Sequence, residues 1–179
     1  MRIPVFIPWR TEDRKYLGLT LVLAITLGLL VGTLYVAFTT VRVDGDSMLP
    51  ALRDEDRVLV TKGYPTPRRG DIISVTMVDG SERVGALKRV VALPGDTVAI
   101  DGDVAYVNGE PSTVAPDALI GGGGQRTDPL VVPAGMVFAL GDNRPVSLDS
   151  RHVGPIPLLE VQGKVVAVIL PVTRFMIID

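Results

Sequence analysis

The sequence has no cysteine and a single histidine, His152. Without cysteine no disulfide can form, and one histidine is too few for a zinc site built from cysteine and histidine ligands. The net charge is −2 and the basic residues are scattered along the chain, so nucleic acid is not expected as a partner.

Charge is absent from one long segment near the start of the chain. No residue from Tyr16 to Val41 is charged, and residues 17–38 are almost all Leu, Val, Ala, Ile, Gly or Thr. At about 1.5 Å per residue, this segment can cross a hydrocarbon core of roughly 30 Å as a helix. A cleaved secretory signal is the alternative. It fits less well, because the run exceeds the roughly 15 residues of a signal core and no convincing small-x-small cleavage site follows it.

The basic residues around this segment predict its orientation. Four precede it (Arg2, Arg10, Arg14 and Lys15), whereas Arg42 alone follows closely. Because basic flanks stay inside, the N-terminus is expected to be cytoplasmic. The predicted organisation is a single-pass protein of the cytoplasmic membrane, with a cytoplasmic tail (1–15), a transmembrane helix (16–39) and an extracytoplasmic domain (40–179).

The remainder of the chain alternates short apolar runs with Gly- and Pro-rich turns. Strand patterns occur at residues 39–44, 57–61, 72–78, 82–93, 97–100, 104–107, 131–140 and 161–170. No helical pattern is visible outside the membrane segment, so we expect a single all-β domain of about 140 residues. Residues 111–129, with the glycine run 121–124, are interpreted as a surface loop; no Lys-Ser/Thr follows that would indicate phosphate binding. Residues 141–154 are interpreted as a polar loop.

Ser47 stands in a turn shortly after the apolar segment. Gly45 and Asp46 favour a bend, and Pro50 restricts the backbone after it, so the serine is expected to project from the turn. Capping of a turn is its alternative role. Nine positions separate Phe38 from Ser47, so Ser47 lies within about 30 Å of the end of the membrane segment.

A serine nucleophile needs a base within hydrogen-bonding reach, and two kinds are present. His152 with Asp142 or Asp149 would form a Ser-His-Asp arrangement. Lys88 lies in an apolar strand pattern, where burial would lower its pKa. The competing interpretation of Lys88 is an edge-strand lysine with its ammonium group in water.

Four segments in order carry a family resemblance. They are Gly-Asp-Ser-Met-Leu-Pro-Ala-Leu at 45–52, Gly-Asp-Ile-Ile at 70–73, Lys-Arg-Val-Val-Ala-Leu-Pro-Gly-Asp at 88–96 and Gly-Asp-Asn-Arg-Pro-Val-Ser-Leu-Asp-Ser-Arg at 141–151. This set resembles the motifs of bacterial type I signal peptidases. The similarity extends from the apolar segment to about residue 164.

The resemblance implies a membrane-anchored serine endopeptidase that removes signal peptides from exported preproteins after small-x-small sites. It assigns Ser47 as the nucleophile, Lys88 as the general base, Ser147 as a serine that orients the lysine, and Asp149 with Arg151 as a supporting ion pair. The other motif residues that it places around the site are Gly45, Met48, Pro50, Gly141, Asp142, Asn143 and Arg144.

The resemblance also implies a mostly β catalytic domain with an apolar face on the membrane, working without metal or cofactor. Its expected partners are preproteins, membrane lipid and the secretion translocon. Gly45 departs from the pattern, since some members carry there a hydroxyl that supports the oxyanion; the Ser47 backbone N–H is the donor that remains. His152 is then expected to be structural or solvated.

Two rival functions remain open at this point. One is a Ser-Lys peptidase of the same fold with a narrower task, such as self-cleavage of a repressor or processing of one dedicated substrate. The other is an inactive relative that holds extended peptides at a sheet edge. The membrane segment and the absence of a DNA-binding segment weigh against the repressor. The presence of both Ser47 and Lys88 weighs against the inactive relative.

Overall fold

The computed structural model describes residues 11–64, 66–102, 104–115, 118 and 126–178. The chain divides into two compact units, residues 1–37 and residues 38–179. The predicted glycine loop at 121–124 lies outside the described residues.

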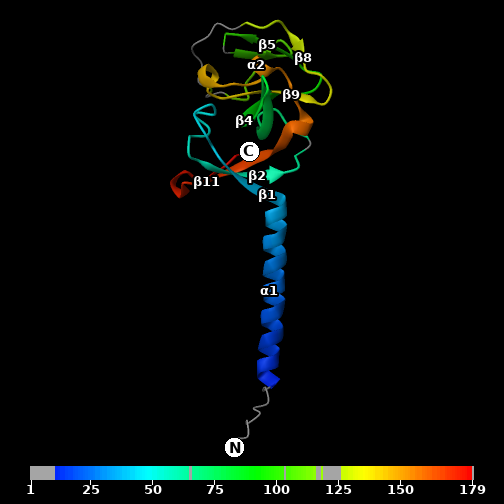
Figure 1. Ribbon diagram of the computed structural model, residues 1–179, viewed down its shortest axis with the longest axis vertical. Coiled ribbons are helices and arrows are strands. Elements are labelled where there is room, and N and C mark those ends of the chain that lie inside the picture. Colours follow the sequence, from blue (N-terminus) through cyan, green and yellow to red (C-terminus); the bar gives the residue numbers. More distant parts are fainter. Residues whose placement is uncertain (1–10, 65, 103, 116–117, 119–125, 179) are drawn as a thin grey trace, which may run out of the picture. The chain divides into compact units, whose positions relative to one another are not determined.

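The first unit contains one helix, α1 (Thr11–Ala37), drawn in blue in Figure 1. Its part from Tyr16 to Ala37 is 22 residues long with a mean hydropathy of 2.3. A helix of that length spans about 33 Å, enough to cross a bilayer. Its apolar side chains are exposed, as is usual for a helix that faces lipid. Helix α1 ends at Ala37, two residues before the predicted boundary at residue 39. It ends there because Phe38 and Thr39 already pair with Thr61 and Val60 in an antiparallel pair of strands.

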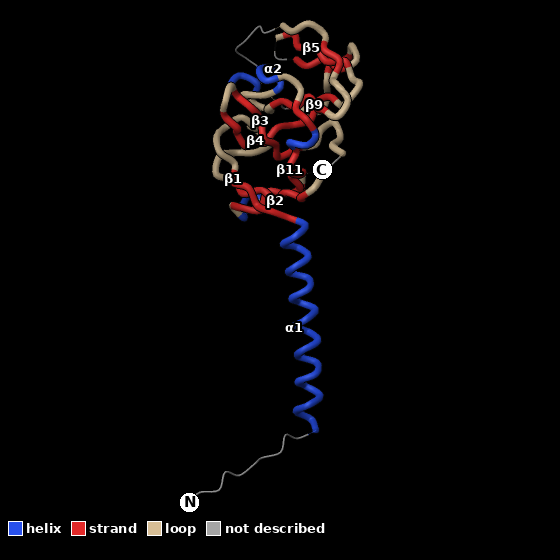
Figure 2. Tube along the Cα trace, turned by 45° about the vertical axis from the view of Figure 1, so that its right-hand side comes forward, coloured by secondary structure: helices blue, strands red, loops and turns tan. Residues whose placement is uncertain are grey.

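The second unit is built from two antiparallel sheets (Figures 1 and 2). The larger has the order β1-β2-β11-β3-β4-β9-β10, with β12 also paired to β11. Its strands are β1 (Phe38–Arg42), β2 (Arg57–Lys62), β3 (Ile72–Asp79), β4 (Glu82–Ala92), β9 (Met136–Leu140), β10 (Ile156–Pro157), β11 (Val161–Leu170) and β12 (Met176–Ile177). The smaller has the order β7-β6-β5-β8, from β5 (Thr97–Asp101), β6 (Val104–Val107), β7 (Glu110–Pro111) and β8 (Leu130–Val131). The predicted class, a mostly β protein with one N-terminal apolar helix, is confirmed.

Two segments differ from their predicted secondary structure. The run 131–140 forms two strands, β8 and β9, because Pro133 and Gly135, whose φ is +77°, turn the chain between them. The segment after β9 is also not wholly a loop. It contains a 3-10 turn, η1 (Arg144–Val146), and a short helix, α2 (Ser150–Val153), which Asp149 caps by accepting a hydrogen bond from the Arg151 backbone N–H. The remaining short elements are η2 (Leu158–Glu160) and η3 (Val172–Arg174).

Apolar residues anchor the Ser47 turn to the larger sheet. Met48 is 1% exposed and Leu52 is fully buried, and both pack in one cluster with Val43 and with Val58 of β2. Burial of side chains of this size contributes about 2 kcal/mol each. The serine therefore stands on a turn whose neighbours are fixed in the core.

Strand β4 is paired on both sides for only part of its length. It pairs with β3 from Glu82 to Arg89, but with β9 only at Arg89, Val90 and Ala92. Within the described residues, the edge of β4 from Glu82 to Lys88 is left without a neighbouring strand. Lys88 is thus the last residue before β9 joins.

Candidate active site

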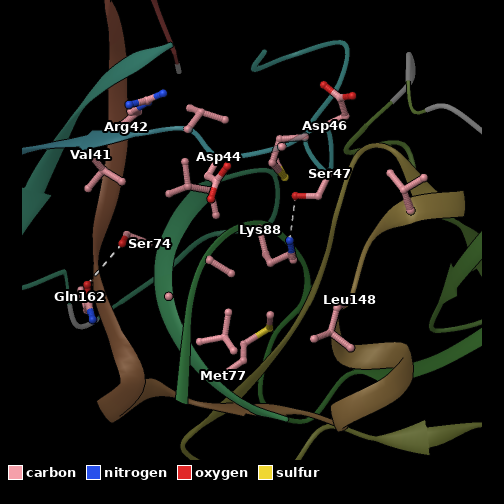
Figure 3. A pocket seen from close by; sticks show the side chains of 18 residues that line it. Val41, Arg42, Asp44, Asp46, Ser47, Ser74, Met77, Lys88, Leu148 and Gln162 are labelled. Carbon is pink, nitrogen blue, oxygen red and sulfur yellow. Dashed lines mark hydrogen bonds between the residues drawn. The ribbon is translucent and has the colours of Figure 1, made fainter. Parts of the chain in front are cut away.

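Ser47 and Lys88 are in direct contact. The Nζ atom of Lys88, in β4, donates a hydrogen bond to the Oγ atom of Ser47 at 3.0 Å (Figure 3). Lys88 is only 3% exposed, so it is not an edge lysine with its ammonium group in water. A hydroxyl and an amine at this distance can exchange a proton.

Burial is the main influence on the pKa of Lys88. Removal from water lowers that pKa from its ordinary value of 10.5, and the nearby charge of Arg151 lowers it further. The carboxylates of Asp149 and Asp142 raise the pKa of Lys88, but by less than burial and Arg151 together lower it. Compared with an exposed lysine, Lys88 is therefore shifted toward the neutral amine, the form that can accept a proton.

His152 takes no part in this contact. Its side chain is 43% exposed, and its Nδ1 atom accepts a hydrogen bond from the Asp149 backbone N–H at 3.4 Å. This bond and the Asp149 cap form a reciprocal capping box at the start of α2. The geometry therefore gives His152 a structural role.

Asn143 positions the backbone on either side of Ser47. Its side-chain Nδ2 donates to the Asp46 carbonyl at 3.0 Å, and its backbone N–H donates to the Ser47 carbonyl at 3.0 Å. In a trans peptide the carbonyl and the N–H point in opposite directions. The bond to Asp46 therefore also orients the Ser47 N–H. Gly45, with φ +79°, begins this turn, and its N–H donates to Asp54 at 2.9 Å.

The segment 141–151 is held by a buried ion pair. Asp149 and Arg151 have side chains that are 0% and 4% exposed, with Nε and Oδ1 2.9 Å apart. Burial raises the pKa of Asp149, but the hydrogen bond and charge of Arg151 and the Gly141 N–H outweigh burial and hold this pKa below 3.8. Arg151 also donates to the Arg144 carbonyl at 2.6 Å, and Arg144 donates to the Gly141 carbonyl at 2.9 Å.

Gly141 packs closely against Ser147 and against the Ser47 backbone. The Ser147 Oγ atom is buried. It lies near the Asp149 carboxylate and helps to lower the pKa of that group, but it makes no hydrogen bond of regular geometry with the residues that the structure describes. A Cβ atom added to Gly141 would lie 2.2 Å from Ser147 Oγ and 2.6 Å from the Ser47 carbonyl oxygen. Glycine is thus required there by close packing.

Asp142 has a partner that sequence reasoning did not assign. Its two oxygens accept hydrogen bonds from Arg89 at 2.8 and 2.6 Å, and Arg89 also donates to the Gly70 carbonyl at 2.9 Å. Strand alternation puts Arg89 on the face opposite to Lys88. The position of Arg89 directly after Lys88 was the only feature of the sequence that pointed to a role for Arg89 near the site.

A cleft of about 600 Å³ opens beside Ser47 and Lys88 (Figure 3). One wall is the segment from Val41 to Met48 and the other is the unpaired edge of β4 from Val84 to Lys88. Ser74, Met77, Val146, Leu148 and Gln162 complete the lining. Sequence reasoning did not identify Ser74, Gln162 or Gly85 as lining residues. In the described part of the chain, no three His, Cys, Asp or Glu side chains are grouped so that they could hold a metal ion.

Comparison with known proteins gives a consistent result. A family model described as signal peptidase, peptidase S26, matches residues 15–170. The chain is 33% identical over 172 residues to signal peptidase I of Leptolyngbya laminosa, covering 91% of this chain and 81% of that protein. It is 38% identical over 159 residues to signal peptidase I of Bacillus licheniformis, covering 80% and 81%. A crystal structure of a signal peptidase I from Enterococcus faecalis V583 has 34% identity and a TM-score of 0.44, covering 55% of this chain and 96% of that one. The chain therefore belongs to the signal peptidase family, peptidase S26, and is a hydrolase that cleaves the signal peptides of preproteins.

Proposed function

We propose that the enzyme cleaves signal peptides with Ser47 as the nucleophile and Lys88 as the general base. The observation that carries the proposal is the 3.0 Å contact between Lys88 Nζ and Ser47 Oγ in a buried setting. A serine hydroxyl is too weak an acid to attack an amide unaided, and the lowered pKa of Lys88 favours the neutral amine that it needs.

The reaction proceeds in two halves. Lys88 accepts the Ser47 proton as Oγ bonds to the scissile carbonyl carbon, and the resulting ammonium gives this proton to the leaving amine as the C–N bond breaks. The product of this half is an ester between Ser47 and the signal peptide. Lys88 then takes a proton from water, whose oxygen attacks the ester, and returns this proton to Ser47 Oγ as the peptide leaves as a carboxylic acid, which releases its proton to solvent.

The oxyanion of each tetrahedral intermediate needs a donor, and the Ser47 backbone N–H is the one proposed. Its orientation is supported by the bond from Asn143 to the Asp46 carbonyl. Gly45, two positions before Ser47, has no side chain to add a second donor.

Three further residues are proposed to support Lys88. The buried Ser147 hydroxyl is proposed to orient its amine; in support, Ser147 Oγ makes no hydrogen bond of regular geometry within the described part of the chain, although it lies near the Asp149 carboxylate. The Asp149–Arg151 pair is proposed to hold the segment that carries Ser147. In support, Arg151 donates hydrogen bonds to the carbonyl oxygens of Arg144 and Ser147 at 2.6 and 3.3 Å.

The substrate is proposed to bind as an extended strand. The cleft lies between the segment from Val41 to Met48 and the free edge of β4, so the peptide backbone can pair with exposed strand groups. Apolar walls, to which Met48 and Leu87 contribute, favour small residues one and three positions before the cut. This supports cleavage after small-x-small sites.

The membrane topology proposed is N-terminus inside, with the catalytic domain outside. The basic residues before Tyr16, where the apolar part of α1 begins, support this orientation. Phe38 follows α1 directly, so the catalytic domain begins at the membrane surface, where a translocated signal peptide ends. Membrane lipid and the secretion translocon are proposed as partners on this basis.

The test is cleavage of a purified preprotein in detergent by the wild type and by Ser47→Ala, Lys88→Ala and His152→Ala, with the new N-terminus read by mass spectrometry. We expect the wild type and His152→Ala to cut after a small-x-small site, and the other two to be inactive although folded. Activity of Lys88→Ala would refute the dyad. Failure of a folded wild type would favour a dedicated substrate or a binding role.

A further inference from the structure

One end of the cleft is polar. Ser74 in β3 is 7% exposed, and its hydroxyl donates a hydrogen bond to Oε1 of Gln162 in β11 at 3.4 Å (Figure 3). The Nε2 atom of Gln162 donates to Oγ1 of Thr76 at 2.8 Å. Gln162 is therefore held between two hydroxyl groups of β3. We call Ser74, Thr76 and Gln162 the polar corner.

Strand β4 leaves space beside the polar corner. Gly85 pairs with Thr76, and Leu87 pairs with Ser74, in antiparallel register. Directly opposed residues of such a pair point to the same face of the sheet. A Cβ atom added to Gly85 meets no atom within 4 Å in the described part of the chain. Glycine inside a strand weakens it and often marks the close approach of a ligand.

The polar corner lies away from the catalytic pair. In Figure 3, Ser74 and Gln162 lie on the side of the cleft where Val41 lies, and Ser47 lies on the other side. An extended peptide that runs from Ser47 toward Val41 places every second side chain on the same face, about 7 Å apart. The residue directly before the cut lies beside Ser47 and Lys88. The next side chain on the same face of the peptide is two positions earlier, and it belongs to the third residue before the cut.

We propose that Ser74, Gln162 and Gly85 form a subsite that selects a hydroxyl-bearing residue, threonine or serine, at the third position before the cut. This inference rests on the proposed function. A serine oxygen has two acceptor lone pairs and one donor proton, and Ser74 gives its proton to Gln162. A threonine hydroxyl of the substrate donates to Ser74 Oγ, and its methyl group occupies the space beside Gly85.

Valine has the shape of threonine but no hydroxyl. At this subsite it separates Ser74 from water without offering a donor in return, which is unfavourable for a buried polar group. One neutral hydrogen bond changes an equilibrium by about two- to tenfold. Threonine is therefore preferred over valine, although the cleft is mostly apolar.

The experiment compares peptides that carry alanine at the first position and threonine, valine or alanine at the third. The full-length enzyme in detergent is used as wild type, Ser74→Ala and Gly85→Ala. We expect wild-type kcat/KM for threonine to exceed that for valine by about two- to tenfold, and the preference to disappear in Ser74→Ala. In Gly85→Ala, which has no steric conflict in the free enzyme, kcat/KM falls for threonine and valine more than for alanine.

The first position provides the internal control. The ratio of kcat/KM for alanine over serine at that position is expected to be the same in the wild type and in Ser74→Ala. A threonine-to-valine ratio of one or less in the wild type, or a ratio unchanged by Ser74→Ala, overturns the subsite while leaving the proposed function intact. Failure of the folded wild type to cut the peptide with alanine at both positions overturns the proposed function, and the subsite with it.

Discussion

The side-chain amide of Asn143 donates a hydrogen bond to the Asp46 carbonyl at 3.0 Å, one peptide bond before Ser47. This bond fixes the peptide unit whose N–H belongs to Ser47, the donor proposed for the oxyanion. Asn143 touches no reacting atom in this arrangement, so it is a positioning residue.

Asn143→Ala is therefore expected to lower kcat by about 10- to 100-fold, less than the loss of an oxyanion donor itself, with little change in KM. Active-site titration with an acylating inhibitor separates this role from a structural one. A positioning defect slows every active site, whereas a folding defect reduces their number. An unchanged rate per titrated site would contradict the role given to Asn143.

Lys88→Arg is expected to be inactive, with a loss of about 10²- to 10⁴-fold or more in kcat/KM. A guanidinium group keeps its charge at every accessible pH and cannot take the Ser47 proton. The measurement is peptide cleavage by the variant, with circular dichroism to establish folding. Turnover near the wild-type rate would remove Lys88 from the role of base.

The pH dependence of kcat/KM follows from the same residue. Only the neutral amine accepts a proton, so activity rises with pH through the pKa of Lys88 in the folded enzyme. Burial lowers this pKa, so the rise is expected below pH 10.5, the ordinary lysine value. A profile whose rise is centred at or above that value would show that Lys88 is not shifted, or is not the base.

Stability provides an independent check on Lys88. Because its pKa is lowered on folding, the unfolded chain binds more protons between the folded and the ordinary pKa, and stability rises with pH across that window. The penalty for burying the charge is full below the folded pKa and is lost above the ordinary value. Lys88→Met is thus expected to raise the free energy of unfolding by about 1–4 kcal/mol at low pH, with the gain declining toward pH 10.5. Denaturant unfolding at several pH values measures it, and a gain independent of pH would contradict it.

The sequence predicted individual strands better than their arrangement. The run around Lys88 could be assigned to a strand because apolar residues surround it, and it lies in β4. The segment 141–154 was interpreted as a loop because the side chain of Asp149, rather than an apolar period, starts helix α2. The division of 131–140 into two strands depends on the turn at Gly135, which a mostly apolar run conceals.

The contacts within the candidate site could be predicted only in part, because they join residues that are far apart in the sequence. Ser47 and Lys88 are separated by 41 positions, and the ordered motifs, rather than any local pattern, associated them. Ser74 and Gln162 are 88 positions apart, and their contact depends on the pairing of β3 with β11, which no local signal reveals. The requirement for glycine at 141 depends on where Ser147 lies.

Arg151→Ala is expected to destabilise the catalytic domain by about 3–5 kcal/mol, because it leaves the carboxylate of Asp149 buried without its partner. Asp149→Asn in the same chain should recover part of this loss. Arg83→Ala is the matched control, since the Arg83 side chain is 63% exposed in its pair with Glu160 and its loss should cost about 1 kcal/mol or less. Denaturant unfolding compares the three; equal losses for Arg151→Ala and Arg83→Ala would contradict a buried structural pair.

Removal of residues 1–37 is expected to leave a folded domain that still cuts short peptides, because residues 38–179 form a compact unit of their own. The deletion must stop at Ala37, since Phe38 pairs with Thr61 of β2. The fragment is expected to bind lipid vesicles through apolar residues at the rim of the cleft, of which Val146 is 63% exposed. Val146→Ser should weaken this binding, measured by co-sedimentation with vesicles, whereas Val131→Ser, on a residue of the smaller sheet that is 59% exposed, should not. Equal effects of the two substitutions would mean that the fragment binds through general surface hydrophobicity, and the cleft rim would then have no special part in meeting the membrane.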